Sequence, residues 1–372
     1  MRGGDQHYMK FDIKKILKPL GAIIPAVLSV VLALVIGAVI IEATGSSAVE
    51  AYRVLVRGAF GNRHAISETI LRSGVLLLTG LSFAFVWKCG LINIGAEGQL
   101  FMGGAAGAAV GIYFPGLPAF ILLPFALITG FVAGSLWGGL VGVLKARFNT
   151  NEIITTLMLN FIAILFVSFL VNGPMKDQAQ TFPLSPPVAD AARLPILLQG
   201  TRLHYGIFIS LACLVFYWFF YRYTVRGYRL RAIGQNRNCA EYAGFNVRRN
   251  MFVALTIGGG FAGLGGAIEI LGIQQRLFDG FAIGYGFDGV AAALLAAGHP
   301  VGMLLTSILF GALRSGGNAV QMFTSVPFNI VQIVQSVVII AVLMRIFSKM
   351  PNIAGIKDRI SNMTSNKNKE EV

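Results

Sequence analysis

The chain has 372 residues, of which 55% are hydrophobic and only 12% are charged, and its formal net charge is +14. Soluble domains carry about 25% charged residues, so the composition argues against a soluble domain and indicates a membrane protein. The three cysteines (Cys89, Cys213 and Cys239) lie far apart in the sequence. This spacing excludes both a disulfide framework and a cysteine-based metal site.

The apolar stretches predict an all-α polytopic membrane protein with about ten transmembrane helices. A span needs about 20 apolar residues. The first candidate follows a basic start and is too long for the core of a signal peptide, so we interpret it as a retained span. In chain order the candidates are residues 20–41, 69–88, 91–114, 119–144, 153–172, 204–221, 251–271, 287–298, 301–318 and 326–346, the eighth of them short.

The distribution of Lys and Arg predicts the orientation of these spans. With the N-terminus in the cytoplasm, 21 of the 30 basic residues fall on the cytoplasmic side. This asymmetry is the positive-inside pattern, and it explains the net charge without a nucleic-acid partner. Arg53, Arg57 and Arg63 fall on the outer side and count against this orientation.

The spans divide into two halves of five helices with opposite orientation. Inverted repeats of this kind build many transporters, and their substrate path lies at the interface between the repeats. The predicted parts are a cytoplasmic N-terminal tail (1–19), a first membrane half (20–172), an extracytoplasmic loop rich in proline (173–203), a second membrane half (204–346) with a cytoplasmic loop (221–250), and a cytoplasmic C-terminal tail (347–372).

The third span of each half is interrupted by glycines and polar residues, at residues 89–104 and 280–300. A broken helix at membrane depth is tolerated only where it faces protein or a wet cavity. The paired positions therefore favour a functional role for both segments. The alternative is that their glycines serve only the close packing of helices.

Polar side chains inside the predicted spans are candidates for the translocation path. Acids are costly in hydrocarbon and face a cavity or a partner. Glu97 either lines the path or locks helix packing, and Glu269 and Asp288 are either functional or merely interfacial. Amides on one face of span ten suit an uncharged polar solute, or they bond to neighbouring helices. The path candidates are Asn93, Glu97, Gln99, Asn160, Asp288, Asn329, Gln332 and Gln335.

Motifs for catalysis point away from an enzyme. Residues 258–263 match G-x-G-x-x-G but lie inside a predicted span, so they indicate close packing rather than dinucleotide binding. The sequence contains no G-x-x-x-x-G-K-[ST] motif and no clustered set of nucleophile or metal ligands. We therefore expect a non-catalytic chain with no cofactor of its own.

The loop at 221–250 is the most informative stretch of the chain. It holds seven arginines and a single acid, Glu241, and residues 236–243 can form a short helix closed by Gly244. A loop that only crosses the surface does not need a helix with a glycine stop. The pattern therefore indicates a loop that transmits force to a partner, with plain positive-inside charge as the alternative.

Two stretches carry a family likeness. Residues 90–99 (GLINIGAEGQ) and 230–244 (LRAIGQNRNCAEYAG) resemble permease subunits of bacterial ABC importers for branched-chain amino acids, ribose-type sugars and nucleosides. The first stretch is most similar to the nucleoside-uptake branch, which works with basic-membrane-protein-type lipoproteins. At residues 237–239 the chain has Arg-Asn-Cys, where relatives often have a proline followed by small or acidic residues.

The resemblance implies a multi-pass permease subunit of the bacterial inner membrane with both termini in the cytoplasm. The implied partners are a second homologous permease, an external substrate-binding lipoprotein, membrane lipids, and a cytoplasmic ABC ATPase, single or tandem, which binds ATP and Mg²⁺. A nucleoside is the expected solute, while riboflavin, ribose-type sugars and branched-chain amino acids stay open. An ion-coupled secondary transporter is the alternative class, but it would need acids at mid-membrane, and Glu97, Glu269 and Asp288 all lie toward span ends in this threading.

The resemblance also implies that residues 236–243 form the coupling helix, which docks in a groove of the ATPase. Arg229 and Arg231 would flank this helix, Glu241 would pair with an arginine of the ATPase, and Gly234 and Gly244 would set the helix ends. The residues implied for coupling are Arg229, Arg231, Gly234, Asn236, Ala240, Glu241, Ala243 and Gly244.

Overall fold

The computed structural model describes residues 35–43, 45–324, 333, 336 and 337. Residues 52–324 form one compact unit, and the other described residues belong to a second unit. Regular structure in the described residues is helical, and strand-like pairing is limited there to two isolated bridges. The helices are α2 (Ala48–Phe60), α3 (Arg63–Trp87), α4 (Ala96–Tyr113), α5 (Ala119–Phe148), α6 (Glu152–Asn172), α7 (Gly206–Tyr223), α8 (Val225–Gln235), α9 (Arg237–Tyr242), α10 (Val247–Ile268), α11 (Tyr285–Leu295) and α12 (Pro300–Phe323), with a 3₁₀ turn η1 (Asp190–Ala192) and a π-helix η2 (Glu269–Gln274).

Five helices of the described residues are long and apolar enough to cross a membrane: α3, α5, α6, α7, and α10 together with η2. They overlap the second, fourth, fifth, sixth and seventh predicted spans. The total of ten spans stays a prediction, because the first and tenth lie largely outside the described residues. The hydropathy pattern predicts no span between residues 41 and 69, and the structure has the amphipathic helix α2 in this stretch.

The core of the compact unit is built on α3 and α10. α10 packs against α3, α4 and α5, and glycines let the backbones approach closely. A Cβ added at Gly134 of α5 would lie 2.6 Å from the Cα of Gly263 in α10, and one added at Gly138 would lie 3.0 Å from the Cα of Gly259. The glycine motif at residues 258–263 is thus confirmed as a packing motif.

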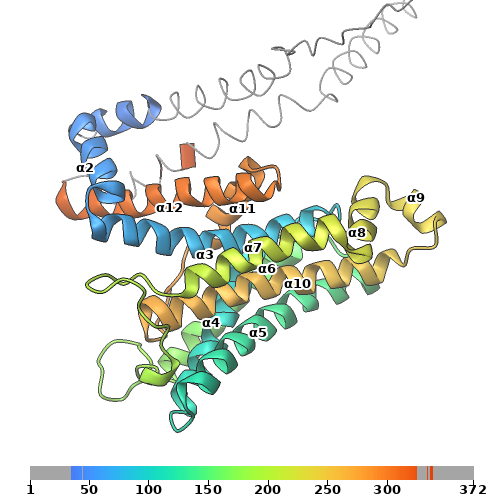
Figure 1. Cartoon of the computed structure of the whole chain (residues 1–372), viewed down its shortest axis with the longest axis horizontal. Coiled ribbons are helices and arrows are strands. Elements are labelled where there is room, and N and C mark those ends of the chain that lie inside the picture. Colours follow the sequence, from blue (N-terminus) through green and yellow to red (C-terminus); the bar gives the residue numbers. More distant parts are fainter. Residues whose placement is uncertain (1–34, 44, 325–332, 334–335, 338–372) are drawn as a thin grey trace, which may run out of the picture. The chain divides into compact units, whose positions relative to one another are not determined.

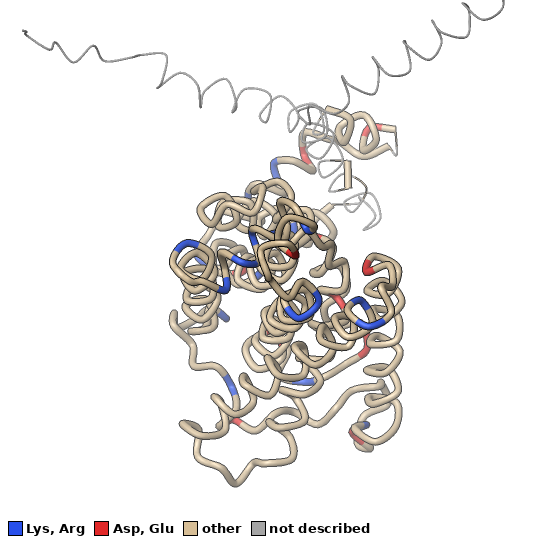
Figure 2. Tube along the Cα trace, turned by 90° about the vertical axis from the view of Figure 1, so that its right-hand side faces the viewer, with Lys and Arg blue, Asp and Glu red and all other residues tan. Residues whose placement is uncertain are grey.

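The outer helices carry apolar side chains on their exposed sides. Phe120 and Leu136 of α5 are 78% and 71% exposed, and Leu165 of α6 is 68% exposed. A long helix that is apolar on all sides is typical of a helix that contacts the hydrocarbon core of a membrane. Most of the described trace is uncharged (Figure 2).

The two ends of the long helices differ. Helices α8 and α9 lie at one end, and the loop between α6 and α7 lies at the opposite end (Figure 1). That loop is tied down by backbone bonds: the N–H of Ser185 donates to Leu277 O (2.8 Å), that of Ala189 to Gly111 O (2.9 Å), and that of Leu194 to Leu271 O (3.0 Å). The loop therefore covers the end of α4 and the π-helix η2.

Both glycine-broken segments contain a partial helix. In the first segment, α4 begins only at Ala96, after the non-helical residues 91–94. In the second, α11 has only 11 residues, which is too short for a span. The predicted eighth span at 287–298 therefore corresponds to a helix shorter than a full crossing, and this helix begins beside the C-terminal half of α3, where Thr79 Oγ1 donates to Tyr285 O (3.0 Å).

Candidate functional site

The short helix α9 is closed at both ends by local hydrogen bonds. Asn236 caps its start, because the side-chain Oδ1 accepts from the N–H of Cys239 (3.0 Å). At its end Gly244 has φ +79°, and the N–H of Phe245 donates to Ala240 O (3.0 Å). This is a Schellman arrangement with glycine in the left-handed region. The prediction of a short helix closed by Gly244 is confirmed.

The preceding residues differ from the prediction. The resemblance implies that Gly234 sets the start of the short helix, but Val225–Gln235 form the separate helix α8. Gly234 lies in the last turn of α8, and Arg229 and Arg231 lie on the same helix. Thr224 caps α8, because its Oγ1 accepts from the N–H of Gly227 (3.0 Å), and the arginines that follow are good helix formers. The α8–α9 hairpin is thus residues 225–244.

The α8–α9 hairpin has an anchored inner side and a free outer side. Ala240 is 4% exposed, whereas Glu241 and Ala243 are exposed. The guanidinium of Arg229 lies 5.7 Å from the ring centre of Phe245, which attaches α8 to the start of α10 by a cation–π contact. A hollow of about 400 Å³ opens here and offers both signs of charge; it is lined by Arg237, Glu241, Phe245, Asn246, Val247 and Arg248.

The hairpin touches the first broken segment directly. A Cβ built on Gly90 would lie 3.1 Å from the Cα of Gly234, and one built on Gly234 would meet the backbone of Lys88. Gly90 itself has φ +75°. The two stretches that carry the family likeness therefore meet backbone to backbone. No side chain lies between α8 and residues 88–90 at this contact.

A buried network of amides holds the first broken segment in shape. The Asn93 amide nitrogen donates to Ser82 Oγ and to Gln99 Oε1, both at 3.0 Å, and Gln99 is 1% exposed. Asn160 of α6 accepts from the N–H of Gly98 (2.8 Å) and donates to Ile94 O (2.9 Å). The structure thus brings three path candidates together, and their polar atoms are bonded to protein.

Glu97 links the two broken segments. Its carboxylate accepts from the N–H of Gly284 (2.6 Å) and from the N–H of Gly286 (2.9 Å). These groups lie at the N-terminus of α11, where unpaired N–H groups and the helix dipole favour a negative charge. Glu97 is 2% exposed. This geometry favours the packing role that the sequence left open.

The other two acids are also bonded to protein groups. Asp288 accepts from Arg314 of α12 (2.8 Å), and the Arg314 guanidinium stacks 3.8 Å above the centre of the Tyr285 ring. Glu269 starts the π-helix and accepts from Gln274 (2.8 Å). Sequence reasoning missed Arg314, although an arginine within an apolar stretch is itself a signal of a buried partner.

Three path candidates have no described geometry. Asn329, Gln332 and Gln335 lie outside the residues that the structure describes.

Comparison with known proteins decides the family. Residues 65–343 match the family model described as branched-chain amino acid transport system / permease component. The chain belongs to this permease family. The permease is also similar to curated relatives over nearly its whole length, and none of the solved structures matches it.

Three curated relatives align with this chain over at least nine-tenths of their own length. The guanosine ABC transporter permease NupP of Bacillus subtilis is 39% identical over 331 residues, which cover 88% of this chain and 94% of NupP. The glucose ABC transporter permease TsgB13 of Haloferax volcanii is 35% identical over 90% of this chain and 91% of its own. The nucleoside ABC transporter permease NupB of Lactococcus lactis is 31% identical over 94% and 97%.

B. subtilis and L. lactis each have a second permease whose name gives the same solute and which is less similar to this chain. These are NupQ of B. subtilis, 25% identical over 70% of this chain and 85% of its own, and NupC of L. lactis, 23% identical over 75% and 90%. The relatives are thus ABC transporter permeases that occur in pairs, and this chain is a multi-pass membrane protein of the same kind.

Proposed function

We propose that this chain is one of two permease subunits of an ATP-driven importer that carries nucleosides into the cell. The observation that carries the proposal is the α8–α9 hairpin: a helix capped at both ends, exposed at Glu241, and in backbone contact with the broken segment at Gly90. Such a hairpin suits a part that receives a movement from a partner and passes it on. The names of NupP and NupB favour a nucleoside, and that of TsgB13 keeps a sugar as the runner-up.

In this proposal the α8–α9 hairpin faces the cytoplasm and docks on an ABC ATPase. The ATPase binds and hydrolyses ATP with Mg²⁺, and this chain supplies no catalytic group. Glu241 and Arg237 at the hollow beside α9 form charge-assisted contacts with the ATPase. The other coupling residues act by position: Asn236, Ala243 and Gly244 hold the ends of α9, Ala240 seats it, and Arg229, Arg231 and Gly234 hold α8.

The remaining parts follow the same topology. The chain lies in the bacterial inner membrane with both termini in the cytoplasm, in two inverted halves (20–172 and 204–346). The loop at 173–203 faces outward, toward a lipoprotein that delivers the solute. A second permease of the NupQ or NupC kind completes the pathway. Support for this sidedness comes from Lys88 beside the hairpin and from the loop at the opposite end of the helices (Figure 1).

Uptake by the reconstituted importer tests the proposal. Proteoliposomes with the two permeases, the ATPase and the lipoprotein take up guanosine only when ATP is supplied to the ATPase. We expect Glu241→Lys to abolish this uptake, because it reverses the charge on the exposed side of α9. Glu241→Asp is the matched control: it keeps the negative charge on the exposed side of α9, so we expect it to retain uptake. Uptake that survives without ATP and collapses with the ion gradient would identify a secondary transporter.

A further inference from the structure

The turn between α11 and α12 (residues 296–299) lies at the end of the second broken segment and has a strained backbone. Ala297 has φ +49° and Gly298 has φ +65°, so two successive residues lie in the left-handed region. Residues with a side chain rarely adopt this region, and such conformations persist only where the surrounding structure holds them. The turn therefore needs an anchor outside itself.

The anchor comes from α7 and from the residue that follows α3. The hydroxyl of Tyr217 donates to Gly298 O (2.8 Å), and Tyr217 is 1% exposed. A Cβ built on Gly298 would lie 3.4 Å from the Tyr217 hydroxyl and 3.2 Å from Cε of Lys88. Gly298 thus packs against both the Tyr217 hydroxyl and the Lys88 side chain.

Both anchoring residues also adjoin the α8–α9 hairpin. A Cβ built on Gly234 of α8 would meet the carbonyl of Lys88. Tyr217 lies one turn before Tyr221, and the centres of their rings are 5.2 Å apart. A Cβ built on Gly227 of α8 would lie 2.9 Å from the Cα of Tyr221, so the backbones of α7 and α8 approach closely. The hairpin therefore reaches the turn of the second broken segment through Lys88 and Tyr217, in addition to its contact with the first segment.

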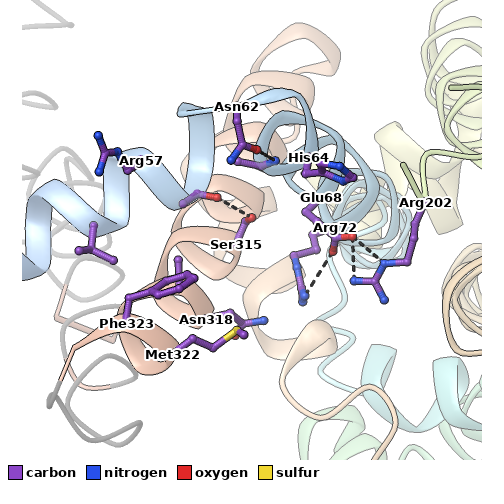
Figure 3. A pocket seen from close by; sticks show the side chains of 14 residues that line it. Arg57, Asn62, His64, Glu68, Arg72, Arg202, Ser315, Asn318, Met322 and Phe323 are labelled. Carbon is purple, nitrogen blue, oxygen red and sulfur yellow. Dashed lines mark hydrogen bonds and ion pairs between the residues drawn. The ribbon is translucent and has the colours of Figure 1, made fainter. Parts of the chain in front are cut away.

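The outer ends of α3 and α12 are held by other groups. The hydroxyl of Ser315 in α12 donates to Gly58 O of α2 (3.2 Å), and Glu68 of α3 forms an ion pair with Arg202 of the loop between α6 and α7 (2.7 Å) (Figure 3). These contacts lie at the end of the helices opposite the hairpin (Figure 1). The inner end of α12 has an attachment of its own, through the turn, to the elements next to the hairpin.

We propose that Tyr217 and Lys88 are positioning residues for transport: they tie the turn between α11 and α12 to the α8–α9 hairpin, so that both broken segments follow one movement of the hairpin. The inference rests on the proposed function and adds two residues to it. Chains of packed and hydrogen-bonded groups carry coupling between distant sites. The role of Tyr217 needs its hydroxyl and not only its ring, because the hydroxyl makes the bond to Gly298 O.

The amount of guanosine taken up per ATP hydrolysed tests this role in proteoliposomes that hold the complete importer. Tyr217→Phe keeps the ring and removes the hydroxyl. We expect the ratio to fall by about 5-fold, the change in an equilibrium that one hydrogen bond typically makes, while the ATPase still co-purifies and still hydrolyses ATP. Lys88→Ala removes the side chain beside Gly298 and keeps the carbonyl that faces Gly234. We expect a fall of similar size.

Thr306→Val is the matched control. Thr306 Oγ1 of α12 donates to Ala292 O of α11 (2.9 Å), and Thr306 is 8% exposed. This variant therefore also removes a hydroxyl that binds the backbone of the second broken segment, but its bond joins α11 to α12 and involves neither α7 nor the hairpin. We expect its ratio of uptake to hydrolysis to match that of the wild type.

The outcomes separate the two proposals. A wild-type ratio in either Tyr217→Phe or Lys88→Ala would overturn the inference, and so would a fall of the same size in Thr306→Val, which would mark a general loosening of α11. If Tyr217→Phe does not assemble with its partners, Lys88→Ala decides the question alone. Absence of ATP-dependent uptake by the wild-type importer would instead refute the proposed function. A lower ratio in both variants, with the control unchanged, supports the positioning role.

Discussion

The link between the two broken segments predicts a large and specific loss of stability when Glu97 is replaced. In Glu97→Ala the N–H groups of Gly284 and Gly286 lose their acceptor, and the carboxylate site is 2% exposed. A buried donor left without a partner costs about 1–3 kcal/mol. Gly286 is buried and Gly284 is only half-buried, so we expect a total loss of about 2–4 kcal/mol.

Glu97→Gln separates the charge from the hydrogen bonds. The amide oxygen still accepts from one N–H, while the amide nitrogen faces the other. We therefore expect roughly half the loss of the alanine variant, about 1–2 kcal/mol. The order of stability is wild type, then Glu97→Gln, then Glu97→Ala.

The assay follows unfolding through the thiol of Cys89, which is 1% exposed and reacts with a fluorogenic maleimide only when the fold opens. Cys213 and Cys239 are replaced by serine in all samples, and melting is recorded in detergent. Glu241→Ala is the control, since that carboxylate is exposed on α9 and we expect no change in melting. If Glu97→Ala melts with the wild type, Glu97 does not hold α11 in place and the packing argument is wrong.

Two glycines give further predictions, with Gly116→Val as a shared control because a Cβ at Gly116 meets nothing within 4 Å. Gly263→Val pushes α10 away from α5, where an added Cβ would lie 2.7 Å from the Cα of Gly134, and lowers stability by about 1–3 kcal/mol; a wild-type melting curve would contradict this. Gly234→Val separates the hairpin from residues 88–90. ATP-driven uptake then falls several-fold while the ATPase still co-purifies, and normal uptake would refute the proposed transmission.

The sequence predicted local structural features better than the contacts between segments that lie far apart in the chain. The short helix closed by Gly244 follows from local capping chemistry, and the long apolar helices follow from composition, so both were accessible. The pairing of Glu97 with the N-terminus of α11 could not be predicted, because the two segments lie 187 residues apart. Hydrophobic periodicity carries no information on which partner a buried acid contacts. The contact between Gly90 and Gly234 could not be predicted for the same reason.

Two differences from the sequence-based expectation have physical causes. Helix α8 was missed because its arginines are typical of a solvated loop, although arginine is a good helix former. The eighth candidate span, already short in the sequence, matches the 11-residue helix α11, because hydropathy measures apolar character and not whether a segment crosses the membrane.

The sidedness of Cys239 tests the account most directly, because coupling to a cytoplasmic ATPase requires the α8–α9 hairpin to face the cytoplasm. Cys239 is exposed on α9, whereas Cys89 is buried and only 1% exposed, so the Cys89 thiol is shielded from the reagent. In a Cys213→Ser chain, a membrane-impermeant maleimide therefore reports on Cys239. We predict no labelling of intact cells and full labelling after permeabilisation. Labelling of Cys239 in intact cells would invert the topology and contradict the importer mechanism.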